Sequence, residues 1–182
     1  VQPRHGLCSY YLCNLRPGES VSVELKPSSL IFPDKNIQLI MIATGTGCAA
    51  YRAYVQSMPY ERSPSAPLVF LGFRNREKDF LFGNDWQLFE RNGNIKLFLA
   101  FSRDQTEKIY VQNKLIENGK LLWDSIQKGA YIYVSGNAKR MPDQIYEAFL
   151  EIARIHGSMS HQSAKIFLNS LERHNRYQTE TY

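Results

Sequence analysis

Four short apolar runs recur along the chain, and each is bounded by turn residues. They occupy residues 38–43, 68–73, 95–101 and 130–134. Odd and even positions within them are both apolar, so neither face of such a strand is left for solvent. This pattern is typical of strands buried in a parallel sheet, where both faces are covered.

Between and after these runs, apolar residues recur at helical spacing. The spacing predicts helices over 48–57, 79–91, 109–128, 142–155 and 160–173. Ser160 is expected to cap the last of these, although Ser163 rather than Glu or Gln stands three residues on. Alternating strands and helices are the mark of a doubly wound α/β domain.

The beginning of the chain, residues 1–34, does not fit this alternation. Apolar and polar residues alternate over 21–25, which predicts a strand of an antiparallel neighbour. Pro33 and Asp34 then mark a boundary. We therefore expect two parts: residues 1–34 as the end of one domain, and residues 35–182 as the main domain.

Composition narrows the class of protein. The chain has 182 residues, of which 43% are apolar and 21% charged, as in an ordinary globular domain. No apolar run approaches the roughly 18 residues needed to span a bilayer, and the first five residues contain no apolar segment of a signal peptide. Three cysteines, Cys8, Cys13 and Cys48, suit a reducing compartment and complete no set of metal ligands. We expect a cytoplasmic location, with no membrane partner and no metal.

The charge balance favours an anionic ligand. Lys and Arg number 22 against 17 Asp and Glu, a net charge of +5. This excess by itself does not choose among nucleic acid, lipid headgroups and a phosphorylated small molecule.

A glycine-containing turn follows the first apolar run and opens a predicted helix. Gly45 and Gly47 allow a tight turn close to a ligand, and Thr46 offers a hydroxyl. Unpaired N–H groups at the start of the helix could hold a phosphate. Ala50 stands where the dinucleotide fingerprint has its third glycine, and the motif is not a P-loop. Taken alone, the turn is explained equally well by phosphate binding and by a need for close packing.

A second polar cluster follows the third apolar run. Ser102 and Arg103 end that run, and Lys108 and Tyr110 come soon after. A hydroxyl, a guanidinium and an ammonium together suit a phosphate dianion, and an Arg beside the adenosine ribose accepts a 2′-phosphate. The alternative is a solvated helix start with surface charges.

Several stretches in this order resemble the NADP(H)-binding domain of the ferredoxin–NADP reductase and cytochrome P-450 reductase superfamily. Within it, the chain most resembles the diflavin oxidoreductases of cytosolic iron–sulfur assembly. The resemblance implies a parallel five-stranded sheet with helices on both faces, preceded by a remnant of an antiparallel FAD domain. The stretches that carry it are 6–9, 44–48, 74–76, 79–80, 100–112, 136–139, 141–142 and 176–182.

The resemblance also implies which residues bind cofactors. Contacts to NADP are expected from Gly45, Thr46, Gly47, Arg74, Ser102, Arg103, Lys108, Tyr110, Gln112, Asn137 and Met141. Gly6, Leu7, Cys8 and Ser9 resemble part of an FAD pyrophosphate site that this chain leaves incomplete.

Three further residues are implied to lie on the path of the hydride. Tyr182 holds the place of an aromatic residue that stacks on the flavin and moves aside for the nicotinamide. Glu180 matches a carboxylate that could stabilise positive charge developing on the nicotinamide ring. Ser135 stands where relatives carry a cysteine.

The resemblance therefore implies a module of an NADPH-dependent flavoprotein oxidoreductase, which as a fragment is not expected to turn over alone. NADPH would reduce FAD, and electrons would pass through FMN to an iron–sulfur assembly protein. Alternatives are a ferredoxin–NADP, cytochrome P-450 or methionine synthase reductase. A non-catalytic module for anions or nucleic acid is an alternative of another class. We expect no nucleic-acid partner, because the aromatic residues fall mostly within predicted strands and helices and no RNA-binding motif occurs.

Overall fold

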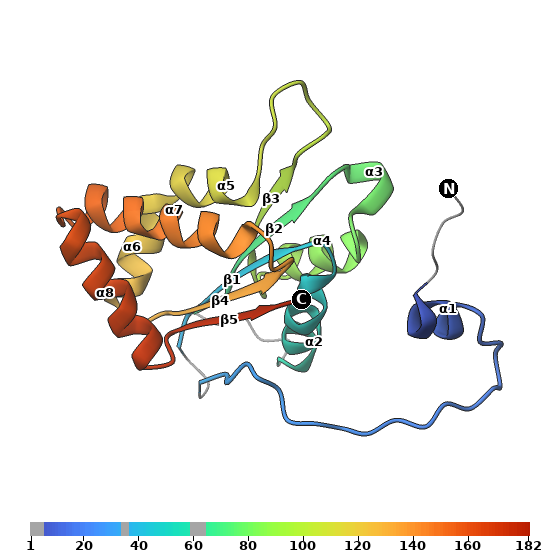
Figure 1. The fold of residues 1–182 in the computed structure, drawn as a ribbon. Helices are drawn as coiled ribbons and strands as arrows, with labels where there is room; N and C mark the ends of the chain where they lie inside the picture. Colours follow the sequence, from blue (N-terminus) through green and yellow to red (C-terminus); the bar gives the residue numbers. More distant parts are fainter. Residues whose placement is uncertain (1–5, 34–36, 59–64) are drawn as a thin grey trace.

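A computed structural model describes residues 6–33, 37–58 and 65–182. Its centre is one parallel sheet of five strands, in the order β3-β2-β1-β4-β5 (Figure 1). All four strands expected from the apolar runs are present, and the fifth lies in the polar tail. The strands are β1 Leu39–Thr44, β2 Leu68–Phe73, β3 Lys96–Phe101, β4 Tyr131–Gly136 and β5 Tyr177–Thr181.

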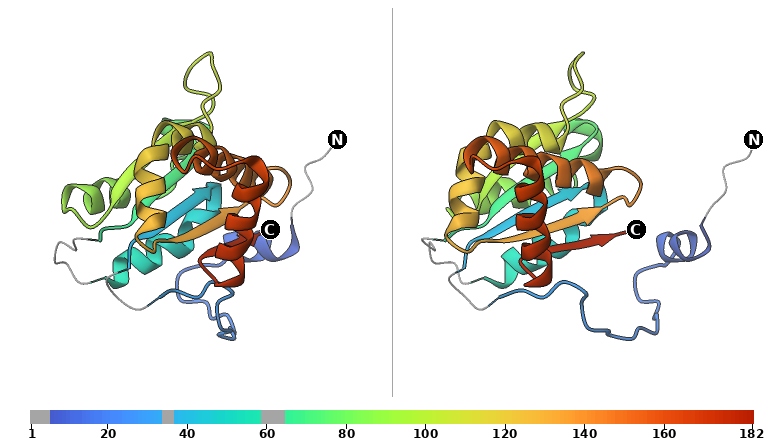
Figure 2. Two further views of the ribbon diagram at one scale, coloured as in Figure 1. Left: turned by 90° about the vertical axis from the view of Figure 1, so that its left-hand side faces the viewer. Right: turned by 60° about the vertical axis from the view of Figure 1, so that its left-hand side comes forward.

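Helices cover both faces of this sheet, as the doubly wound prediction requires (Figure 2). One face carries α5 Val111–Glu117, α6 Gly119–Gln127, α7 Met141–His156 and α8 His161–Arg173. The other carries α2 Cys48–Ser57, α3 Arg76–Asp79 and α4 Gly83–Arg91, while α1 Leu7–Cys13 stands apart from the sheet. A single 3₁₀ turn, η1 Gly45–Gly47, joins β1 to α2.

The core has two layers, one on each side of the sheet. On β1, Ile40 and Ile42 pack into the cluster beneath α5–α8, whereas Leu39 and Met41 pack into the cluster beneath α2 and α4. Each of these side chains is at most 1% exposed. Burying such a side chain contributes about 1.5–3 kcal/mol, which explains why β1 and β2 carry apolar residues on both faces.

The single helix predicted over 109–128 is wrong, because the structure contains two helices there. Asn118 separates α5 from α6, and its side-chain amide donates to the carbonyl of Lys114 at 2.9 Å. The start of α6 also approaches the end of α7: a side chain at Gly119 would lie 2.7 Å from Nε2 of His156. Local capping and this close approach outweigh the continuous helical spacing.

The helix predicted over 79–91 also divides. The Phe80 ring packs edge-on against Phe73 and Phe101, with ring centroids 5.3 and 5.4 Å apart. Phe82 adopts a left-handed backbone conformation with φ of +58° before α4 begins. Aromatic packing thus outweighs helical periodicity at this point.

The strand predicted over 21–25 is wrong. These residues are in extended coil, and the apolar side chains of Val21, Val23 and Leu25 are 44%, 79% and 95% exposed. An alternating pattern needs a neighbouring strand to pair with, and no other described segment pairs with it. The boundary residue Asp34 lies outside the described residues, as does the N-terminal segment 1–5.

The predicted cap of α8 is present and gives a first testable expectation. The hydroxyl of Ser160 accepts a hydrogen bond from the Ser163 N–H at 3.1 Å. Changing Ser160→Ala should lower the free energy of unfolding by about 1 kcal/mol, because one N–H at the helix start loses its acceptor. Urea titration measures this change. Ser160→Asp retains an acceptor and serves as the control; equal losses in both variants would contradict a capping role.

Candidate functional site

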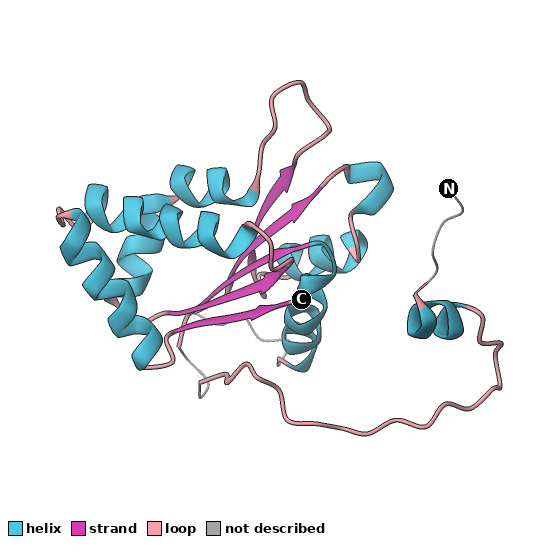
Figure 3. Ribbon diagram, in the orientation of Figure 1, coloured by secondary structure: helices cyan, strands magenta, loops and turns pink. Residues whose placement is uncertain are grey.

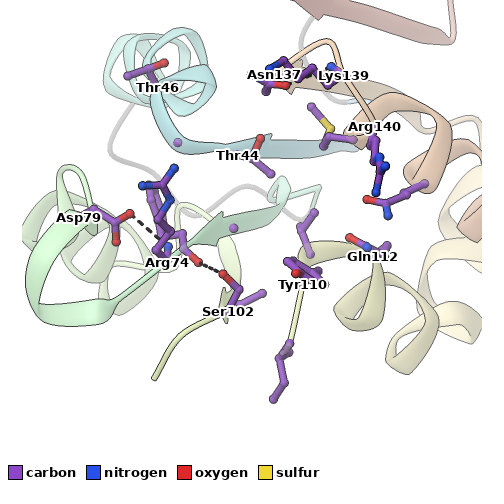
Figure 4. A pocket seen from close by; sticks show the side chains of 18 of the residues that line it. Thr44, Thr46, Arg74, Asp79, Ser102, Tyr110, Gln112, Asn137, Lys139 and Arg140 are labelled. Atoms are coloured by element: carbon purple, nitrogen blue, oxygen red, sulfur yellow. Dashed lines mark hydrogen bonds between the residues drawn. The ribbon is translucent and has the colours of Figure 1, made fainter. Parts of the chain in front are cut away.

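A cleft of about 550 Å³ opens at the carboxyl ends of the strands (Figure 4). Its walls come from the ends of β1, β2 and β3, the start of α5, the loop from β4 into α7, and Tyr182. This is where ligands bind in open parallel α/β sheets, since adjacent loops diverge there.

The turn at Gly45–Gly47 forms one end of the cleft. Gly45 has φ of +55°, a conformation that favours glycine. At Gly47 any side chain would come within 2.5 Å of the Ser135 carbonyl oxygen at the end of β4. The two glycines therefore let the turn lie directly against β4 and leave its backbone accessible from the cleft.

The ends of β2 and β3 hold Arg74 and Ser102 side by side. The backbone N–H groups of Arg74 and Asn75 donate to the carboxylate of Asp79, at 3.2 and 2.6 Å. The N–H of Ser102 donates to the Phe73 carbonyl at 3.0 Å. Asp79 lines the cleft but is already used by the backbone, which orients Arg74 and leaves its guanidinium for a ligand.

Three cationic side chains line the cleft without an acidic partner. Within the described part of the chain, Arg74, Lys139 and Arg140 form no salt bridge. Grouping positive charges around one cleft is unfavourable unless an anion neutralises them. The cleft is therefore suited to a ligand with more than one negative charge.

An exposed aromatic ring lies beside these charges. Tyr110 is 43% exposed and precedes α5, where its N–H donates to the Asn113 side chain at 2.8 Å. Gln112 follows it on the wall of the cleft. An aromatic face next to an amide can stack on a purine base and hydrogen-bond its edge.

Tyr182 lies at the same end of the cleft as the Gly45–Gly47 turn. The Tyr182 hydroxyl hydrogen-bonds to the hydroxyl of Thr46, and the Tyr182 N–H donates to the Gly136 carbonyl at 3.1 Å. Glu180 lies on β5 in register with Ser135 on β4, so the three residues expected on the hydride path lie near one another. Ser135 is buried, at 4% exposure, whereas Tyr182 is 61% exposed.

The structure brings most of the expected NADP residues to one cleft. Its lining includes Gly45, Thr46, Arg74, Ser102, Tyr110, Gln112, Asn137 and Met141, together with Tyr182. Gly47, Arg103, Lys108, Ser135 and Glu180 are not part of the lining. Arg103 and Lys108 are exposed on the loop 102–110, which projects from the sheet edge (Figure 1).

Sequence reasoning missed part of the cationic wall. Lys139, Arg140 and Gln144 line the cleft, yet none was assigned to it. The sequence did contain a signal for two of them, because Lys139 and Arg140 come soon after β4, as Arg74 comes after β2. Strand order places the end of β4 beside that of β1 and its glycine turn, and this adjacency is not visible in the sequence.

The expected FAD stretch forms a local helix but no enclosed site. Gly6 precedes α1, and Leu7, Cys8 and Ser9 form its first turn. All four residues are exposed, and Leu7 is 87% exposed. Their role toward FAD stays a prediction.

Burial makes Cys48 chemically distinct from the other two cysteines. Loss of hydration raises the pKa of the Cys48 thiol to about 11, although Arg52 and the start of α2 act against this shift. The thiol therefore stays neutral until the pH approaches that value. Near pH 8 a thiol reagent should modify exposed Cys8 and Cys13 rapidly and Cys48 only after unfolding. Mass spectrometry of labelled peptides measures this; rapid native labelling of Cys48 would contradict it.

Among residues 6–33, 37–58 and 65–182, none of the helices combines the length and the apolar character that a membrane span requires. The same residues also contain no group of three or more His, Cys, Asp or Glu side chains that could hold a metal ion.

Comparison with known proteins agrees with this fold. Residues 41–146 match the family described as the oxidoreductase NAD-binding domain, and the chain belongs to this family. The class of protein shown by this match is therefore a dinucleotide-binding domain of the oxidoreductase NAD-binding family.

Individual relatives match over the whole chain. It is 41% identical to NADPH-dependent diflavin oxidoreductase 1 of Xenopus laevis and 39% identical to that of Mus musculus, in each case over 100% of this chain and 31% of the relative. It is also 38% identical to the sulfite reductase (NADPH) flavoprotein alpha-component of Vibrio vulnificus, over 100% of this chain and 30% of that protein. The chain thus spans about a third of the length of these curated relatives.

Proposed function

We propose that this chain is the NADPH-binding part of a diflavin oxidoreductase and presents NADPH for hydride transfer to FAD. The observation that carries the proposal is the cleft at the carboxyl edge of the sheet, lined by Arg74, Lys139 and Arg140, which form no salt bridge among the described residues. A dinucleotide with a 2′-phosphate supplies the several negative charges that this cleft suits. The relatives' names supply the cofactor class.

We infer that the expected residues divide among the parts of this ligand. Ser102, Arg103 and Lys108 would hold the 2′-phosphate, and Tyr110 with Gln112 the adenosine. Further along the cleft, Arg74 and the Gly45–Gly47 turn would hold the pyrophosphate, and Asn137 and Met141 would complete the wall.

When bound, NADPH supplies the hydride, and the protein supplies position and charge. Tyr182 covers the Thr46 end of the cleft, so the nicotinamide must displace its ring to enter. Glu180 would stabilise positive charge on the oxidised ring. Ser135 would offer only a small polar surface there.

Electrons would then pass through FMN to a protein acceptor outside this chain. We propose an iron–sulfur assembly protein in the cytoplasm as that acceptor, supported by the resemblance to the diflavin branch. A partner in sulfite reduction is the second candidate, favoured by the 38% identity to the flavoprotein alpha-component from Vibrio vulnificus.

Calorimetric titration of the chain tests the ligand. NADP⁺ should bind one to one, NAD⁺ much more weakly, and 2′,5′-ADP should bind without needing the end of the cleft that Tyr182 covers. Absence of binding by all three compounds would overturn the proposed function. Equal affinity for NADP⁺ and NAD⁺ would overturn the assignment of the 2′-phosphate group.

A further inference from the structure

Residues 28–33, here called the anchored segment, lie against the α2 side of the sheet (Figures 1 and 3). Leu30 is only 4% exposed and belongs to the core cluster beneath α2 and α4. The Phe32 ring stacks on Tyr54 of α2 and on Tyr133 of β4, with centroids 4.4 and 4.8 Å apart. The segment is thus part of the packed domain, although residues 21–25 before it are exposed coil.

The side chain of Gln178 on β5 binds both backbone groups of Ile31. The Ile31 N–H donates to Oε1 of Gln178 at 2.8 Å, and Nε2 donates to the Ile31 carbonyl, also at 2.8 Å. The Tyr133 hydroxyl donates to the same carbonyl at 2.8 Å. The side-chain amide therefore pairs with Ile31 as the peptide group of a neighbouring strand would.

A further hydrogen bond fixes the orientation of this amide. Nε2 of Gln178 also donates to the Asn175 carbonyl at 2.7 Å, so both of its hydrogens are used. Every polar group of the Gln178 side chain has a partner, and two of its three contacts hold one residue 147 positions away in the chain. Packing against the sheet would not require every polar group of the Gln178 side chain to be hydrogen-bonded.

The same strand leads directly to the cleft. Gln178 lies two residues before Glu180 and four before Tyr182, whose N–H is held by the Gly136 carbonyl at 3.1 Å. β5 therefore fixes the anchored segment at one end and the mouth of the cleft at the other. Before residue 28 the chain runs away from the sheet toward α1 (Figure 1).

We propose that Gln178 is a positioning residue that sets the direction from which the preceding domain joins the sheet, and so aligns the flavin with the cleft. This inference rests on the proposed function, in which that domain carries FAD. Hydride transfer requires the reacting atoms to lie about 3–3.5 Å apart, and a 1 Å misplacement can slow a reaction about a hundredfold. The bidentate contact between Gln178 and Ile31 restrains the point at which the chain leaves the sheet.

The test compares Gln178→Ala with Thr179→Ala in the complete flavoprotein that contains this chain. Thr179 is the exposed neighbour on the same strand and is the control. In Gln178→Ala, flavin reduction by saturating NADPH should slow about ten- to a hundredfold, with unchanged KM and unchanged affinity for 2′,5′-ADP. Hydrogen exchange at the Ile31 amide should accelerate in this variant alone. Tyr133→Phe, which removes one donor and keeps the stacked ring, should give a smaller effect of the same kind.

Two results would overturn the inference. One is an unchanged rate of flavin reduction in Gln178→Ala although the Ile31 amide has been released. The other is retained protection of that amide, which would show that Gln178 does not anchor the segment. If Gln178→Ala fails to fold, the same two measurements on Tyr133→Phe test the inference. Failure of the unmodified protein to bind 2′,5′-ADP would instead contradict the proposed function, and the inference would fall with it.

Discussion

Replacing Arg103 with alanine is expected to remove most of the preference for NADP⁺ over NAD⁺. Arg103 follows β3, and its N–H donates to the Arg74 carbonyl at 2.8 Å, so its position at the strand end is fixed while its side chain stays exposed. A hydrogen bond to a charged group contributes about 1.5–3 kcal/mol. The affinity for NADP⁺ should therefore fall about ten- to a hundredfold, at 1.4 kcal/mol per factor of ten, while that for NAD⁺ stays the same.

Calorimetry with both dinucleotides measures this change. The matched control is Arg91→Ala, which removes the same charge from the end of α4, where Nε of Arg91 donates to the Gln87 carbonyl at 3.3 Å. A loss of affinity in both variants would indicate a general effect of net charge. If Arg103→Ala binds NADP⁺ as tightly as the unchanged protein, the loop after β3 does not hold the 2′-phosphate.

Removal of the Tyr182 side chain is expected to strengthen binding of the whole dinucleotide. Its hydroxyl bonds to Thr46, so a nicotinamide entering there must first break this contact. One such hydrogen bond is worth about 0.5–1.5 kcal/mol net. Tyr182→Phe should therefore bind NADP⁺ about two- to tenfold more tightly, and Tyr182→Ala more tightly still, because the ring itself is gone.

The fragment 2′,5′-ADP is the control for this series. It ends before the nicotinamide, so its affinity should be the same in all three proteins. A parallel change in 2′,5′-ADP affinity would show that Tyr182 acts on the cleft as a whole. Weaker binding of NADP⁺ by Tyr182→Ala would show that the tyrosine is part of the binding surface.

The sequence alone determined four of the five strands of the sheet and the edge at which the cleft opens. The strand runs carry apolar residues on both faces, which favours burial on both faces, so a parallel sheet under two layers of helices followed from them. Gly45 and Ser102 each follow a strand and line the cleft, since the carboxyl ends of parallel strands share one edge. The local sequence pattern is sufficient to predict an element wherever its structure depends on residues that are close in the chain.

Contacts between distant segments were decided by the tertiary structure. Phe82 interrupts a helical pattern because Phe80 packs on two strands, and Arg140 reaches the cleft only because β4 lies beside β1. The pairing of Gln178 with Ile31 and of Tyr182 with Thr46 joins residues 147 and 136 positions apart. No local periodicity encodes such pairs, because they form only once packing has fixed which strands are adjacent and how their ends align.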